Sequence, residues 1–131
     1  ETQSLMMRFN GDLFTLLYHC ATGRLSASDI SFARDAAVCV VMAAKGYPAA
    51  YIKGSLIKNL DRAGAMEGVK IFHAGTERRD NDIIATGGRV LGVTARGPSI
   101  KEAQARAYQA VDALDWPEGF CRRDIGWRAL S

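Results

Sequence analysis

The sequence predicts an α+β fold in which a small, mainly antiparallel sheet carries one packed helix and is preceded by helical segments. Three observations support this class. Residues 36–44 and 69–74 have the apolar patterns of strands, Gly87-Gly88 separates two further apolar runs as in a hairpin, and an amphipathic helix begins after Pro98. The 131 residues are 48% hydrophobic and 24% charged, which suits a globular domain and excludes a disordered chain.

The first part of the chain is predicted to be helical. Its apolar residues recur at three- and four-residue spacings, which indicates helices with one buried face: Leu5, Phe9, Leu13, Leu16, Leu17 and Cys20. Residues 10–12 (Asn-Gly-Asp) interrupt this pattern, so we expect two helices with a cap between them, and Thr22-Gly23 ends the second. These first 25 residues or so do not obviously belong to the sheet that follows.

Strand patterns begin at residue 36. Residues 36–44 are apolar on both faces, which predicts a central strand, and residues 69–74 form a second strand. Between them we expect a loop over residues 51–59, with room for a short edge strand at 55–58. The charged stretch 77–82 is predicted as a solvated turn. Residues 83–85 then lead through Gly87-Gly88 into a third strand at 89–95, as a hairpin.

One helix is predicted after the strands. Ser99 can cap it, and Glu102 can reach back to complete a capping box. An apolar stripe along this helix is expected to face the sheet: Ile100, Ala103, Ala107, Val111 and Leu114. Trp116-Pro117 ends the helix, and residues 120–130 form a charged, aromatic tail.

Composition excludes several classes of function. The net charge of +3 is spread over both halves of the chain, so we expect no binding to nucleic acid or to a membrane surface. The longest uncharged apolar run, residues 36–44, is far shorter than the roughly 20 residues that span a bilayer, and no secretion signal is recognisable. Three widely spaced cysteines and two histidines fit neither a disulfide framework nor a zinc site, and indicate a reducing compartment.

Three stretches have the residue types of a binding site. In Gly87-Gly88-Arg89, glycine N–H groups and a guanidinium could hold an anion, although a hairpin turn with a surface arginine is the commoner use of this pattern. Residues 73–76 place His73, Gly75 and Thr76 at a strand end, where the alternative is a plain strand-to-turn transition. Residues 122–124 are either an anion clamp or a surface ion pair. No stretch forms a self-contained active site.

Several of these segments together resemble one family. In order they are residues 40–48 (VVMAAKGYP), 72–76 (FHAGT), 86–95 (TGGRVLGVTA), the helix with Ala107-Tyr108, and 120–127 (FCRRDIGW). They resemble the C-terminal part of the bacterial phosphoribosylamine–glycine ligase (glycinamide ribonucleotide synthetase) family, within the ATP-grasp superfamily. Glu1-Thr2-Gln3 also looks like the end of the family's Gly-Asp-Pro-Glu-Thr-Gln segment. The resemblance covers nearly the whole chain.

The resemblance implies a role in joining glycine to 5-phosphoribosylamine with ATP, which forms glycinamide ribonucleotide, ADP and phosphate in purine biosynthesis. It divides the chain into the helical end of an ATP-grasp domain, 1–30, and a C-terminal domain of the rudimentary single-hybrid type, 31–131. The family's sites for ATP and Mg²⁺ (or Mn²⁺) precede these residues, so no catalytic residue, metal ligand or bound cofactor is expected here. The intact enzyme is expected to be monomeric and cytoplasmic, with small molecules as its partners.

The resemblance also implies a part of the phosphoribosylamine site. Related ligases hold the ribose phosphate with an arginine in Arg-x-Leu-Gly-Val, which matches residues 89–93 and assigns the phosphate to Arg89, with Gly87 and Gly88 beside it. Where a related site carries two adjacent arginines, this chain has Val90, so Arg123 is the candidate for a second cation. Further candidates come from matching motifs: His73, Gly75, Thr76, Asp124 and Glu1. The alternative is a stand-alone, non-catalytic binding or interaction module derived from that domain.

Overall fold

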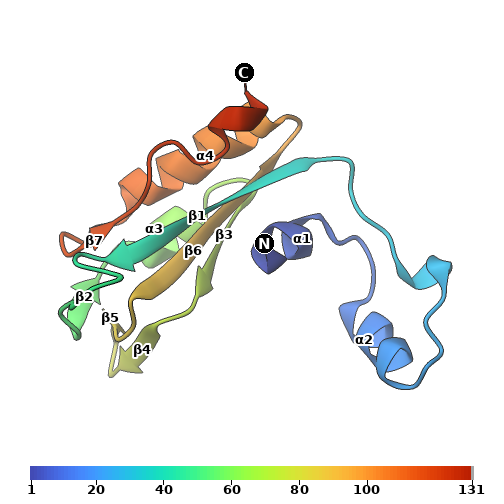
Figure 1. The fold of residues 1–131 in the computed structure, drawn as a ribbon, viewed down its shortest axis with the longest axis horizontal. Coiled ribbons are helices and arrows are strands. Elements are labelled where there is room, and N and C mark those ends of the chain that lie inside the picture. The colour runs from blue at the N-terminus through green and yellow to red at the C-terminus, as the bar shows by residue number, and fades with distance from the viewer. Residues whose placement is uncertain (131) are drawn as a thin grey trace.

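The computed structural model describes residues 1–130, and it combines two antiparallel sheets with one long helix and an N-terminal helical arm (Figure 1). The predicted α+β class is confirmed. The α-helices and 3-10 turns are α1 (Thr2–Arg8), α2 (Leu13–Ala21), η1 (Ala27–Asp29), α3 (Leu60–Gly64), α4 (Ile100–Ala113) and η2 (Trp127–Ala129). The strands are β1 (Ala36–Ala44), β2 (Ser55–Ile57), β3 (Val69–His73), β4 (Thr76–Arg79), β5 (Asp82–Ala85), β6 (Arg89–Gly97) and β7 (Gly119–Phe120).

The larger sheet has the strand order β3-β6-β1-β7 and is antiparallel throughout. Strand β1 is central, as its two apolar faces predict, and pairs with β6 from Ala36 opposite Gly97 to Ala43 opposite Arg89. The strands predicted at residues 69–74 and 89–95 are also confirmed, as β3 and β6. No helix among the described residues is long and apolar enough to cross a membrane.

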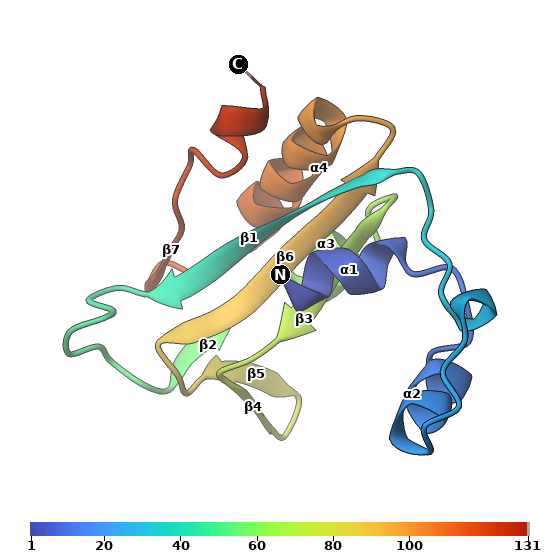
Figure 2. The same cartoon turned by 45° about the vertical axis from the view of Figure 1, so that its right-hand side comes forward.

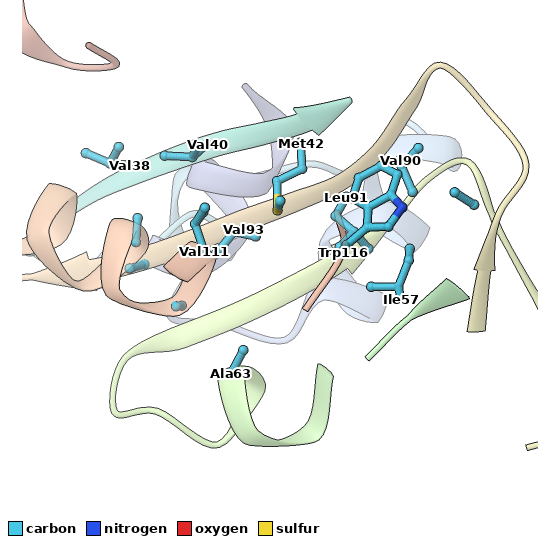
Figure 3. Packing of buried hydrophobic residues seen from close by; sticks show 14 of the residues in the cluster. Val38, Val40, Met42, Ile57, Ala63, Val90, Leu91, Val93, Val111 and Trp116 are labelled. Carbon is cyan, nitrogen blue, oxygen red and sulfur yellow. The ribbon is translucent and has the colours of Figure 1, made fainter. Parts of the chain in front are cut away.

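Helix α4 packs against β1 and β6 and closes the core on one face of the larger sheet (Figure 3). Ser99 caps it by accepting a hydrogen bond from the Glu102 N–H, and the Ser99 hydroxyl lies 3.3 Å from the Glu102 carboxylate. The predicted apolar stripe holds, because Ala103, Ala107 and Val111 are buried against the sheet.

The smaller sheet, β2-β5-β4, was only partly predicted. The expected edge strand at 55–58 is β2. The prediction of a solvated turn over 77–82 is wrong, because β4 pairs with β5 and only Asp80 and Asn81 turn between them, Asp80 with a φ of 54°. Strand β4 is an edge strand with three exposed, charged side chains, so its sequence lacks the apolar alternation of a buried strand.

The predicted hairpin at Gly87-Gly88 is also wrong. Strand β5 pairs with β2 and β4, whereas β6 pairs with β1 and β3, so residues 86–88 cross from one sheet to the other instead of turning back. Residues 45–54 and 74–75 make the same crossing. Trp116 fastens the two sheets at a further point, because its indole N–H donates to the Ser55 hydroxyl at 2.9 Å.

The N-terminal arm, residues 1–35, packs mainly through α1, which contacts β1 and β6 on the face away from α4 (Figure 2). The predicted break between two helices is confirmed, with Asp12 as the cap of α2 and Gly23 beyond its end. Helix α2 projects away from the sheets. No residue of α1, α2 or η1 is buried.

Candidate functional site

Three connectors meet where the two sheets join, and we call this region the junction: residues 45–54, 74–75 and 86–88. A Cβ atom at Gly75 would lie 2.6 Å from the Gly87 Cα, and one at Gly88 would lie 2.2 Å from Cδ2 of Tyr47. Real Cβ contacts essentially never fall below 3.0 Å. Glycine is therefore required at Gly75 and Gly88 by close approach, and neither has a φ in the left-handed region.

Arg89 leaves the junction as the first residue of β6. The register between β1 and β6 shifts so that Met42 opposes Leu91 while Ala43 opposes Arg89, which leaves Val90 as an extra residue in a β-bulge. Such bulges redirect the neighbouring side chain. Arg89 is exposed, and among residues 1–130 it forms no ion pair or side-chain hydrogen bond. Its guanidinium is free to bind an anion.

His73 and Thr76 flank the two residues whose backbone pairs with the start of β6. The Ala74 and Gly75 N–H groups donate to the carbonyls of Val90 and Arg89, at 3.0 and 3.1 Å, and hold the end of β3 along the start of β6. His73 Nδ1 and the Thr76 hydroxyl share a hydrogen bond of 3.0 Å. The structure therefore brings together six of the predicted site residues: His73, Gly75, Thr76, Gly87, Gly88 and Arg89.

The backbone donors of the junction are not equally available. The Gly87 N–H donates to the Gly75 carbonyl at 3.2 Å, so it is already occupied. The Gly88 N–H has no acceptor among the described residues. The two successive glycine N–H groups that the sequence suggested are therefore not both available, and only that of the buried Gly88 is unoccupied beside Arg89.

The side chains of Arg123 and Asp124 form their ion pairs with α4 and within the tail, not with the junction. Arg123 forms a 2.6 Å ion pair with Asp112 of α4, and its guanidinium carbon stands 5.6 Å from the centre of the Tyr108 ring. Asp124 accepts two hydrogen bonds from Arg122, which lower the pKa of its carboxyl. Both residues are engaged in the tail, which matches the surface ion pair that the sequence left open as the alternative.

Glu1 forms no hydrogen bond or ion pair with the described residues of the junction. It lines a shallow hollow with Arg8 and Asp35 beside the first residues of β1. That end of β1 pairs with Gly97, whereas Arg89 opposes the other end of the strand. Within residues 1–130, no group of three or more His, Cys, Asp and Glu side chains could hold a metal ion.

Tyr47 and Tyr51 border the junction, and Tyr51 also packs against the hydrophobic core. Their ring centres are 6.3 Å apart and their planes are at 61°, and both rings lie against the α-carbon of Gly88. The signal in the sequence was their position around Pro48, directly after the central strand. Nothing local showed that this loop meets Gly88, because that contact joins residues distant in the chain.

Comparison with known proteins places the chain in a family. Residues 37–128 match the family model described as phosphoribosylglycinamide synthetase, C domain. The chain is 51% identical to phosphoribosylamine–glycine ligase from Brucella melitensis and 53% identical to the ligase from Mesorhizobium japonicum, each over 100% of this chain and 31% of the relative. It is 52% identical to the chloroplastic ligase of Arabidopsis thaliana, over 99% of this chain and 25% of that protein.

A solved structure agrees with these matches. The crystal structure of phosphoribosylamine–glycine ligase from Thermotoga maritima superposes with a TM-score of 0.69 and 30% sequence identity, and the match covers 85% of this chain and 26% of that one. The chain thus spans less than a third of the length of these relatives. Sequence and fold agree that the chain belongs to the phosphoribosylglycinamide synthetase C-domain family.

Proposed function

We propose that this chain is the C-terminal part of a ligase that joins glycine to 5-phosphoribosylamine at the expense of ATP, and that its junction holds the phosphate of phosphoribosylamine. The observation that carries the second statement is the exposed, unpaired Arg89 next to the free Gly88 N–H. A phosphate dianion placed there would accept charge-assisted hydrogen bonds worth about 1.5–3 kcal/mol each. His73 and Thr76 hydrogen-bond to each other at the neighbouring end of β3, and we propose that they add polar groups to this site.

The reaction itself is assigned to a longer polypeptide. Transfer of the γ-phosphoryl group of ATP to the glycine carboxylate would give an acyl phosphate and ADP. Attack of the phosphoribosylamine amine on its carbonyl carbon would then form the amide and release phosphate. In this proposal, ATP and the metal ion bind to the preceding ATP-grasp domain. The boundary at about residue 30, a monomeric enzyme and a cytoplasmic location stay predictions. The chloroplastic relative in Arabidopsis shows that location differs within the family.

The helical arm supports a longer polypeptide. Phe14 and Tyr18 stack with ring centres 6.1 Å apart, yet their side chains are 76% and 51% exposed, and Leu17 is 60% exposed. An apolar helix face of this extent is normally covered. We propose that the preceding domain of the ligase covers it.

The test is Arg89→Ala in the intact ligase. Loss of one or two charge-assisted hydrogen bonds to phosphate should raise KM for phosphoribosylamine by about 10- to 100-fold and leave KM for ATP nearly unchanged. Arg62→Ala is the matched control, because Arg62 is an exposed arginine of α3 outside the junction. An unchanged KM for the amine in Arg89→Ala would remove Arg89 from the phosphate site.

A gene-level observation separates this proposal from the stand-alone module. An open reading frame that continues upstream of Glu1 with an ATP-grasp pattern is expected for the ligase. A start codon directly before Glu1 would instead favour a binding module without ligase activity.

A further inference from the structure

We propose that Tyr47 is a specificity residue of the phosphate site, and that its hydroxyl hydrogen-bonds to the sugar of a sugar phosphate bound at Arg89. This inference rests on the proposed phosphate site. Tyr47 lies outside both motifs that supplied the site residues, namely residues 89–93 with Arg89 and residues 72–76 with His73 and Thr76.

The position of Tyr47 is fixed by its neighbours. Its ring lies on the α-carbon of Gly88, where even a methyl group would come within 2.2 Å of Cδ2. Behind it, Tyr51 packs edge to face at 6.3 Å, and Tyr51 itself contacts the hydrophobic core. Tyr47 is therefore the outer ring of the pair, wedged between a core-anchored aromatic ring and the residue that precedes Arg89.

The loop that carries Tyr47 is fastened at both ends. At its start, the Ala44 N–H donates to the Gly88 carbonyl at 2.8 Å, and at its end the Gly54 N–H donates to the Ala85 carbonyl at 2.7 Å. These two bonds join the ends of the loop to Gly88 and to Ala85, at either end of the connector between β5 and β6. The ring and the start of β6 therefore keep a fixed relation to each other.

The hydroxyl of Tyr47 is available for a ligand. Tyr47 is half-buried, and among residues 1–130 its hydroxyl has no hydrogen-bond partner. The ring lies on the residue that precedes Arg89, so in this proposal it meets the ester substituent of a phosphate held by Arg89. A tyrosine offers an apolar face to the sugar ring and a donor and acceptor to its hydroxyls. The geometry thus fits a sugar phosphate better than a bare phosphate.

Titration of the intact ligase with two probes tests this role. Ribose 5-phosphate and methyl phosphate both present a phosphate ester, and only the first carries a sugar. Amide chemical shifts of the junction residues would give both dissociation constants. The wild-type ligase should bind ribose 5-phosphate more tightly, and Tyr47→Phe should weaken that binding about fivefold without changing the constant for methyl phosphate, because one neutral hydrogen bond is lost.

Two further variants make the result specific. Tyr51→Phe removes the same hydroxyl from the inner ring and should leave both constants unchanged. Arg89→Ala should weaken both probes alike, because it removes the phosphate contact. Each variant keeps the ring or the backbone of the junction, and unchanged amide shifts of Val93 and Ala107 would show that the core is intact.

The outcomes distinguish the two proposals. If Tyr47→Phe retains the wild-type preference for ribose 5-phosphate, or if the wild-type ligase has no such preference, the role of Tyr47 is overturned while the phosphate site stands. If Arg89→Ala binds both probes as wild type does, or if the wild-type ligase binds neither, the phosphate site is overturned and the role of Tyr47 with it.

Discussion

The helical arm, residues 1–35, and the sheet domain, residues 36–130, differ in what covers their apolar residues. In the sheet domain, Val40, Leu91 and Val93 are at most 1% exposed between the larger sheet and α4. In the arm no helical residue is buried. Eight of the thirteen exposed large hydrophobic side chains of the described chain lie in the arm, so it holds most of the uncovered apolar surface.

The difference shows that periodicity reports which face of a helix is apolar and not what covers that face. Helix α4 and helix α2 both carry an apolar stripe, and both have a side-chain cap. The stripe of α4 meets β1 and β6, whereas α2 projects away from the sheets. The same kind of sequence signal therefore has a large energetic consequence in one region and a small one in the other.

The largest expected contrast is between two leucines. Leu91→Ala should lower the free energy of unfolding by about 2–5 kcal/mol, because it opens a cavity in the core. Leu17→Ala, at a side chain that is 60% exposed, should change it by less than about 0.5 kcal/mol. Denaturant titration of the 131-residue chain measures both. Similar losses would show that α2 folds cooperatively with the sheets.

The two helix caps give a smaller contrast. Ser99→Ala removes the hydrogen bond to the Glu102 N–H and should lower the free energy of global unfolding by about 1 kcal/mol. Asp12→Ala removes the hydrogen bond to the Phe14 N–H, but it should leave the unfolding midpoint unchanged and only speed amide exchange within α2. A lower midpoint in Asp12→Ala would contradict the independence of the arm.

The smallest contrast is in acid sensitivity. The Ser26 N–H and His19 hydrogen-bond to the Asp29 carboxylate and lower its pKa below the ordinary 3.8. Its contribution therefore favours the ordered arm above pH 3.8 and is lost as the pH falls through the folded-state pKa. NMR shifts at residues 19 and 26–29 should move toward disordered values there, while those of β1 and β6 do not. Asp29→Asn should abolish that step, and its persistence would assign it to another group.

The sequence was sufficient for elements whose signals are local. The apolar runs that became β1, β3 and β6, the Ser99 cap and the break at Asp12 each depend on neighbouring residues only, and all were predicted. Strand β4 was missed because an exposed edge strand with charged side chains has no apolar period. The family assignment came from the order of motifs, not from any of these patterns.

Only the part of the candidate site that depends on local sequence motifs was predicted. Arg89, His73 and Thr76 stand in short motifs that could be read directly. The crossing at Gly87-Gly88 and the place of Tyr47 depend on contacts between segments far apart in sequence, namely Gly75 with Gly87 and Tyr47 with Gly88. Two adjacent glycines look the same in a sequence whether they form a hairpin turn or allow two connecting segments to contact each other.

The long-range pairing of β1 with β6 also constrains the order of folding. The ladder joins residue 36 to residue 97, so it closes a long loop, whereas the β4–β5 hairpin closes over two residues. Local pairs form early and distant pairs late, because loop closure costs entropy before the contacts form. Helix α1 is the first element of the chain, but it packs on β1 and β6. It can therefore dock only after the residues of β6 have been synthesised. During synthesis the arm therefore emerges early and docks late.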